Sequence, residues 1–145
     1  MSQQQTIAKE IELSGKGLFT GEPATVLFKP AQPDTGVVFV RPRSDKLLQV
    51  GALVDNVVPR RRRTSLQNGS FSVDLVEHCL SAVYGLGIDN LVVQTQATEL
   101  PGMDGSPEPY AKALLAGGIV QQEIDRRVFK LTEPIFVKCY NKISL

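Results

Sequence analysis

Hydrophobic and polar residues alternate along much of the first half of the chain, which is the pattern of β-strands with one buried face. Runs rich in β-branched and aromatic residues, bounded by Gly, Pro or polar turn residues, predict strands. The predicted strands cover residues 6–15, 24–31, 36–42 and 47–58 (one strand or two), with a later one at 89–96. Between the last two, residues 59–73 are predicted to hold a basic segment, a short strand and a turn. The first strand is predicted as an edge strand, because Lys9 interrupts its apolar positions. An Asn-Gly pair at 68–69 predicts a hairpin.

A later segment has helical periodicity. Its apolar positions fill roughly half of a helical wheel. They are Leu75, Val76, Cys79, Leu80, Val83 and Tyr84. Asp74 and Glu77 predict a variant of the capping box at the start of this helix, and Gly-Leu-Gly at 85–87 predicts its end.

A second helix is predicted after the loop that begins at residue 99. Ser106 is its predicted N-cap, Pro107 takes the first position, and Gly117 or Gly118 ends it. Strands outnumber helices and the helices come late, so the predicted fold class is α+β. We expect two helices packed on one face of a small mixed or antiparallel sheet, which is a two-layer sandwich.

The pattern of strands and helices is complete before the end of the chain. We therefore predict that residues 1–122 form one α+β domain. Short strand patterns recur at 128–131 and 135–139. Residues 123–145 are accordingly predicted to be a linker and the first strands of a truncated or missing second domain.

The composition is that of an ordinary soluble globular protein. The 145 residues are 42% hydrophobic and 21% charged, with a net charge of +1. This balance gives no general attraction to nucleic acid or anionic membranes, and no apolar run is long enough to span a bilayer. The first residues lack an apolar signal core, and Cys79 and Cys139 do not suggest a disulfide framework. We expect a cytoplasmic protein with no nucleic-acid partner and no transmembrane segment.

His78 is the only histidine, and it follows Glu77. Both lie outside the apolar arc of the first predicted helix, so we expect them to face solvent or a cleft. A metal-bound imidazole beside a carboxylate suits hydrolysis, because the metal activates water and the carboxylate takes its proton. A catalytic zinc needs three protein ligands, however. The residue types alone therefore favour Glu77 as a helix cap and His78 as a surface residue, with Cys79 in the core.

Four motifs in a fixed order carry a resemblance to a known family. They are GKGLFTGEPATVLFKPAQPDTGVVFVR at 15–41, TSL at 64–66, VEHCLSAVYGLGIDNLVV at 76–93 and ELPGMDGSPEPYAKAL at 99–114. Glycine-rich turns alone are weak signals, but VEH, GLGIDN and MDGS in this order are specific. From about residue 5 to 140 the chain resembles the N-terminal domain of the zinc-dependent UDP-3-O-acyl-N-acetylglucosamine deacetylase of lipid A synthesis.

The resemblance implies the first of two similar α+β domains, packed by their helical faces around an active site. It implies that Glu77 is the general base and that His78 is one Zn²⁺ ligand. The other ligands, a His and an Asp in an H-K-x-x-D pattern, and a general-acid His are implied to lie in a second domain. The implied reaction is attack of zinc-bound water on the acetamide, which releases acetate and a free sugar amine. The 145-residue chain alone is then expected to have little or no activity.

Three stretches of the sequence depart from the family pattern. Phe19 replaces the His of GLHTG, four arginines at 60–63 replace apolar or Cys residues, and Gly102 replaces a β-branched or Leu residue. The arginines suit the diphosphate of a UDP-sugar; a solvated basic loop is the alternative, and nucleic-acid contact is a weaker one. Asp104 either lines the substrate site or makes a turn. The expected substrate-binding residues are Thr64, Arg62, Arg63, Phe19 and Asp104.

A second functional hypothesis stays open because two zinc ligands are missing. In it the chain is a non-catalytic, stand-alone relative that binds a partner or a ligand. The helical face that normally packs on a second domain would then be exposed, which predicts a dimer mate or a dedicated partner.

Overall fold

A computed structural model describes residues 2–136. The elements are β1 (Gln3–Ile7), β2 (Ile11–Lys16), β3 (Pro23–Pro30), β4 (Val37–Pro42), β5 (Leu47–Gly51), a 3-10 turn (Val54–Asn56), β6 (Val57–Val58), β7 (Ser65–Asn68), β8 (Phe71–Asp74), α1 (Glu77–Gly85), β9 (Leu91–Thr95), α2 (Glu108–Gly117) and β10 (Ile119–Asp125). The predicted α+β class is confirmed.

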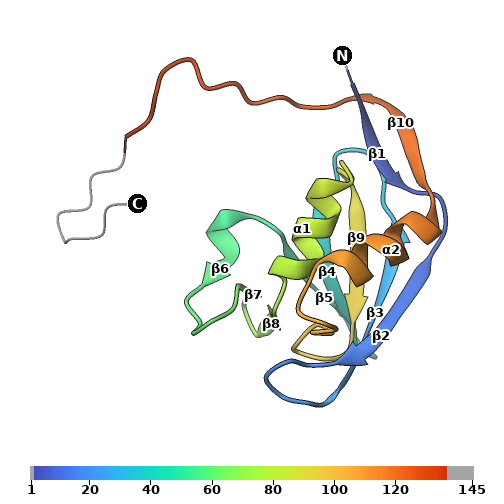
Figure 1. The fold of residues 1–145 in the computed structure, drawn as a ribbon, viewed down its shortest axis with the longest axis vertical. Helices are drawn as coiled ribbons and strands as arrows, with labels where there is room; N and C mark the ends of the chain where they lie inside the picture. The colour runs from blue at the N-terminus through green and yellow to red at the C-terminus, as the bar shows by residue number, and fades with distance from the viewer. Residues whose placement is uncertain (1, 137–145) are drawn as a thin grey trace.

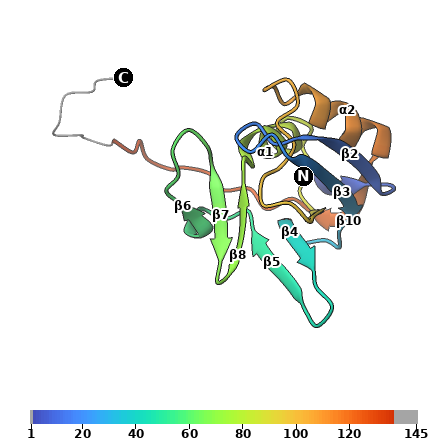
Figure 2. The same cartoon turned by 90° about the horizontal axis from the view of Figure 1, so that it is seen from below.

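The main sheet has five strands in the order β2-β3-β9-β4-β5. β4 and β9 run parallel, while the other neighbours are antiparallel, so the sheet is mixed. α1 and α2 contact each other on one face of this sheet (Figures 1 and 2). The two-layer arrangement predicted from the sequence is therefore confirmed.

The core lies between the helices and the sheet, and alternate strand positions supply it. Val26, Phe28 and Val93 are completely buried on the helical face of β3 and β9. Tyr110 of α2 meets the Phe28 ring edge to face, with centroids 6.2 Å apart. Its hydroxyl donates to the Pro101 carbonyl at 2.6 Å, which satisfies a buried polar group and ties α2 to the preceding loop.

A small sheet, β6-β7-β8, forms a lobe beside β5 (Figure 2). β7 and β8 make the hairpin that the Asn-Gly pair predicts, with Gly69 in the left-handed region at φ 56°. Leu66 and Val73 on these strands belong to the main hydrophobic core. The lobe is thus part of the same folded unit, and it delivers the chain directly to α1.

Residues 6–15 form two strands, so the single strand predicted there is wrong. β1 pairs with β10 in a separate two-stranded sheet, while β2 is the edge of the main sheet. The chain turns at Ala8 and Lys9, whose N–H groups donate to the carbonyls of Gly118 and Gly117 at 2.7 and 3.2 Å. β10 was not predicted, because its amide and acidic residues obscure any alternation.

The chain leaves the domain through β10, beside β1 (Figure 1). β10 continues past the predicted boundary at 122 to Asp125. Residues 126–136 have neither helix nor strand, so the strand predicted at 128–131 is wrong. The one at 135–139 lies mostly outside the described residues, and a second domain stays a prediction. Between residues 2 and 136, no helix is long and apolar enough to cross a membrane.

Candidate active site

The start of α1 is built from long-range contacts. Leu75, buried and in the left-handed region at φ 63°, turns the chain into a helix that no side chain caps. The predicted capping box is wrong, because both of its carboxylates bind residues ahead of β7. Asp74 Oδ2 lies 3.6 Å from Arg63 Nε, and Glu77 Oε2 accepts the Thr64 N–H at 3.0 Å.

Glu77 and Thr64 hold each other in place. The Thr64 carbonyl accepts the N–H of Val76 at 3.3 Å, so this backbone is tied to α1 on both of its sides. The bond to the carboxylate is charge-assisted and fixes one oxygen. Among the described residues, the hydrogen bonds of this carboxylate engage only Oε2.

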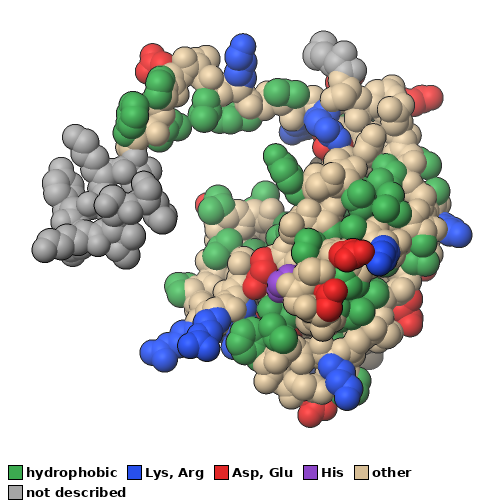
Figure 3. Space-filling model, viewed as in Figure 1, with side chains coloured by type: hydrophobic (Ala, Val, Ile, Leu, Met, Phe, Trp, Pro, Cys, Tyr) green, Lys and Arg blue, Asp and Glu red, His purple; other side chains and the backbone are tan. Residues whose placement is uncertain are grey.

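His78 lies on the same first turn and is partly exposed. In Figure 3 it appears in purple beside an acidic side chain and a group of hydrophobic side chains. Within residues 2–136, no three His, Cys, Asp or Glu side chains are close enough to hold a metal ion. The described residues therefore do not by themselves supply the three protein ligands that a catalytic zinc site needs.

Two expected substrate-side residues, Phe19 and Arg63, contact each other. The Arg63 guanidinium carbon lies 4.5 Å from the centroid of the Phe19 ring, which is a cation–π contact. Arg60, Arg61 and Arg62 are exposed, and Arg62 is in the left-handed region at φ 58°. Only the last arginine of the run is therefore anchored to the domain.

Glu99, which the sequence analysis missed, holds the loop that carries Phe19. Its two carboxylate oxygens accept the N–H groups of Phe19 and Thr20 at 2.7 and 2.9 Å. Burial raises the pKa of Glu99, but the hydrogen bonds from Phe19 and Thr20 outweigh it, so the pKa lies below its ordinary value. A Cβ at Gly17 would lie 2.5 Å from Glu99 Oε2, so Gly17 was the available signal for this contact.

Gly102 is explained by the close approach of two loops. Its N–H donates to the Lys16 carbonyl at 2.8 Å, and a Cβ at this position would lie 2.8 Å from the Leu18 Cβ. Next to it, Asp104 Oδ1 accepts the N–H and the hydroxyl of Ser106 at 2.9 and 2.8 Å. That is the turn that the Asp-Gly-Ser sequence predicts, whereas a substrate role of Asp104 stays a prediction.

Cys79 and Tyr84 of α1 were both predicted on its apolar arc, but they differ in burial. Cys79 is confirmed in the core, where burial raises the pKa of its thiol to about 12 and removes it as a nucleophile at neutral pH. Tyr84 was expected on the buried arc, but it is 88% exposed. The buried face is narrower than the apolar arc, because only Cys79, Ala82 and Val83 of α1 are buried.

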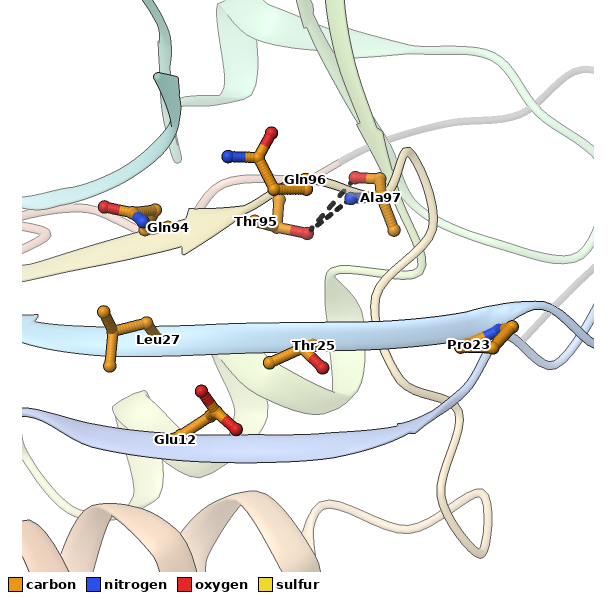
Figure 4. Close-up of a pocket in the computed structure, with 8 residues that line it drawn as sticks. All are labelled: Glu12, Pro23, Thr25, Leu27, Gln94, Thr95, Gln96 and Ala97. Atoms are coloured by element: carbon orange, nitrogen blue, oxygen red, sulfur yellow. Dashed lines mark hydrogen bonds between the residues drawn. The ribbon is translucent and has the colours of Figure 1, made fainter. Parts of the chain in front are cut away.

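A pocket lies on the opposite face of the main sheet. Figure 4 shows this pocket of about 300 Å³, lined by residues of β2, β3 and β9. Glu12 is its only titratable side chain, and Thr95 Oγ1 is occupied by the N–H and carbonyl of Ala97, each at 3.2 Å. It contains no expected site residue and no donor set for catalysis, so the N-terminal end of α1 remains the candidate site.

The sequence comparisons decide the family. Residues 4–144 match the family described as UDP-3-O-acyl N-acetylglycosamine deacetylase. The chain belongs to this deacetylase family. The resemblance noted from the VEH, GLGIDN and MDGS motifs is thereby confirmed.

Related deacetylases are considerably longer. The UDP-3-O-acyl-N-acetylglucosamine deacetylase of Thioalkalivibrio sulfidiphilus is 42% identical over 138 residues, which cover 95% of this chain and 45% of that protein. That of Bdellovibrio bacteriovorus is 39% identical over 92% of this chain and 44% of its own length. The bifunctional enzyme LpxC/FabZ of Chlorobaculum tepidum is 41% identical over 91% of this chain and 28% of its own length. The chain thus spans less than half the length of these deacetylases.

Proposed function

We propose that this chain is the first domain of a cytoplasmic, zinc-dependent hydrolase of lipid A biosynthesis. The proposed substrate is UDP-3-O-acyl-N-acetylglucosamine, from which the enzyme removes acetate. The observation that carries the proposal is the Glu77–Thr64 hydrogen bond, because it orients a carboxylate beside the only histidine in a chain of the deacetylase family.

In this proposal Glu77 is the general base and receives a proton from the attacking water on Oε1. The Thr64 N–H on Oε2 keeps the carboxylate from rotating. His78 would contribute one imidazole ligand to Zn²⁺, and bound zinc supplies Lewis-acid polarisation of the amide carbonyl. The residues of this chain fit one ligand position, so we propose that the other ligands come from a second domain.

The substrate-side roles rest on position. Arg62 is exposed at the end of the arginine loop, where a guanidinium suits a diphosphate. Arg63 and Thr64 follow it and lead to Glu77, and Phe19 flanks them through its contact with Arg63. Asp104 lies on the loop that approaches the Phe19 loop where Gly102 meets Leu18.

Deacetylation by the complete gene product tests the role of Glu77. Glu77→Gln preserves an acceptor for the Thr64 N–H but cannot take a proton, so we expect kcat to fall by about 100-fold or more. Glu108→Gln changes the corresponding first residue of α2 and should keep the wild-type rate. Wild-type turnover by Glu77→Gln would overturn the assignment of the base.

Zinc content tests the role of His78. With one imidazole, the 145-residue chain should bind zinc weakly or not at all. The complete protein should bind one zinc ion and lose it in His78→Ala. Tight zinc binding by the short chain would contradict the second-domain proposal. A folded, complete protein with neither zinc nor activity would instead favour the non-catalytic relative, which the incomplete donor set keeps as the second candidate.

A further inference from the structure

The loop between β6 and β7 has little support of its own. Within residues 2–136, Arg60 donates only to the carbonyl of its neighbour Pro59, at 3.4 Å, and residues 60–62 are exposed. Arg62 also lies in the left-handed region, which is unfavourable for an arginine. The position of Thr64 at the end of this loop must therefore be set by contacts outside the loop.

Thr64 makes two of these contacts itself, with Val76 and Glu77, and its neighbour Arg63 adds the others. Its guanidinium lies over the Phe19 ring on one side, and its Nε lies 3.6 Å from Asp74 Oδ2 on the other. The Nε atom is buried and has no hydrogen-bond partner within the described part of the chain. The side chain is thus fixed by stacking and ionic attraction rather than by a network of hydrogen bonds.

The two partners of Arg63, Phe19 and Asp74, are held in place by backbone hydrogen bonds. The Phe19 N–H is bound by the buried carboxylate of Glu99. The Asp74 N–H donates to the Thr98 carbonyl at 2.8 Å, and its own carbonyl accepts the N–H of Leu100 at 3.1 Å. The stack therefore attaches a weakly supported loop to two segments that the fold itself holds.

We propose that Arg63 is a positioning residue that presents the Thr64 N–H to the Glu77 carboxylate. The proposal rests on the proposed function, in which Glu77 is the base, but the positioning itself is measurable without catalysis. The positioning of Thr64 requires the flat guanidinium group of Arg63 rather than its positive charge alone, because an ammonium group does not stack on a ring in the same way. Partners that orient a catalytic group contribute through geometry, so their loss reduces turnover more than substrate affinity.

NMR of the 145-residue chain provides the direct readout. In Arg63→Gln and in Phe19→Leu, the Thr64 amide proton should shift upfield and exchange with solvent at least about tenfold faster, because its charge-assisted bond opens more often. In Arg63→Lys, the shift and the exchange rate of the Thr64 amide should lie between those of the two variants and those of wild type. Arg61→Gln removes a neighbouring exposed arginine and should leave the Thr64 amide unchanged. Amides of the β7–β8 hairpin report whether the fold survives.

The outcomes separate positioning from the alternatives. An unchanged Thr64 amide in Arg63→Gln, or an equal change in Arg61→Gln, overturns the proposal. So does a change in Arg63→Gln that Phe19→Leu does not reproduce. In the complete protein, Arg63→Gln should lower kcat about tenfold and leave KM within about twofold. A raised KM with an unchanged kcat would leave Arg63 with its proposed substrate-side role alone and overturn the positioning role. If the protein has no deacetylase activity, the NMR result still decides the positioning.

Discussion

The two helices begin in opposite ways. The segment that leads into α2, residues 103–108, is called the α2 lead-in, and it is the simpler of the two segments. Asp104 Oδ1 accepts the N–H of Ser106, and Ser106 Oγ accepts the N–H of Glu108 at 3.2 Å. Each of these bonds joins residues two positions apart. Glu108 then pairs with Lys112 one turn later, at 2.7 Å. The start of α2 is thus held by its own sequence.

The α1 lead-in (residues 74–77) depends on the rest of the molecule. Glu77 reaches Thr64, thirteen positions away, and Asp74 faces Arg63. Neither carboxylate caps the helix. Side chains that would have capped α1 locally are used to fix the arginine loop and the candidate base. The comparison indicates that the helix carrying the candidate site is positioned at its start by tertiary contacts, whereas the start of α2 uses contacts between near neighbours in the sequence.

The largest expected difference in the free energy of unfolding concerns two residues whose backbone lies in the left-handed region. Leu75 and Met103 have φ of 63° and 49°, but they are 1% and 37% exposed. Leu75→Gly relieves about 1 kcal/mol of backbone strain, yet it empties a buried site, so we expect a net loss of about 3 kcal/mol. Met103→Gly should change the free energy of unfolding by less than about 1 kcal/mol. Urea denaturation measures both.

Equal effects of these two substitutions would break the comparison. It would mean that the α1 lead-in is held by its local conformation, like that of α2. Because m-values report the surface exposed on unfolding, they should stay constant if only the native packing changes.

The second expected effect is a dependence of stability on pH. Hydrogen bonds from Ser106 lower the pKa of Asp104, as those from Phe19 and Thr20 lower that of Glu99. A lowered folded-state pKa contributes stability above the unfolded-state pKa, and this is lost as pH falls through the folded-state pKa. Glu99 is buried beside the α1 lead-in, whereas Asp104 is exposed. Glu99→Gln should therefore cost about 2 kcal/mol at neutral pH and flatten the acid side of the stability curve.

Asp104→Asn is the matched control, since it removes a charge on the α2 side. It should leave most of the acid-induced loss of stability in place. Denaturation at a series of pH values between about 7 and 3 tests the difference. A curve flattened more by Asp104→Asn than by Glu99→Gln would contradict it.

The sequence predicted the elements whose signals are local. The Asn-Gly hairpin and the end of α2 at Gly117–Gly118 appear where their turn chemistry places them. Ser106 still binds the N–H of Glu108, although α2 begins one residue later than predicted. The division of residues 6–15 was missed, because it depends on β10, more than a hundred residues away in the chain.

The candidate site was predictable in its chemistry and not in its construction. Glu77 and His78 were identified by resemblance, and both stay proposals. Glu99 carries no motif of its own, yet it holds the Phe19 loop. Its role depends on the backbone of residues 17–20, which form a loop. A loop has no helical or strand periodicity from which its conformation could be predicted. Side chains with tertiary partners override local capping rules, which is why the capping box failed at Asp74 and Glu77.

The smallest expected effect is at Ser106, and it defines how local the α2 lead-in is. Ser106→Ala removes the acceptor for the Glu108 N–H and should destabilise the protein by about 1 kcal/mol. Ser106→Thr keeps a hydroxyl there and should restore most of the loss. The Glu108 amide should exchange faster in Ser106→Ala, while the Thr64 amide at the start of α1 should not change. A response of Thr64 to this substitution would show that the two lead-ins are coupled, and the distinction between a self-contained helix start and one built by tertiary contacts would then fail.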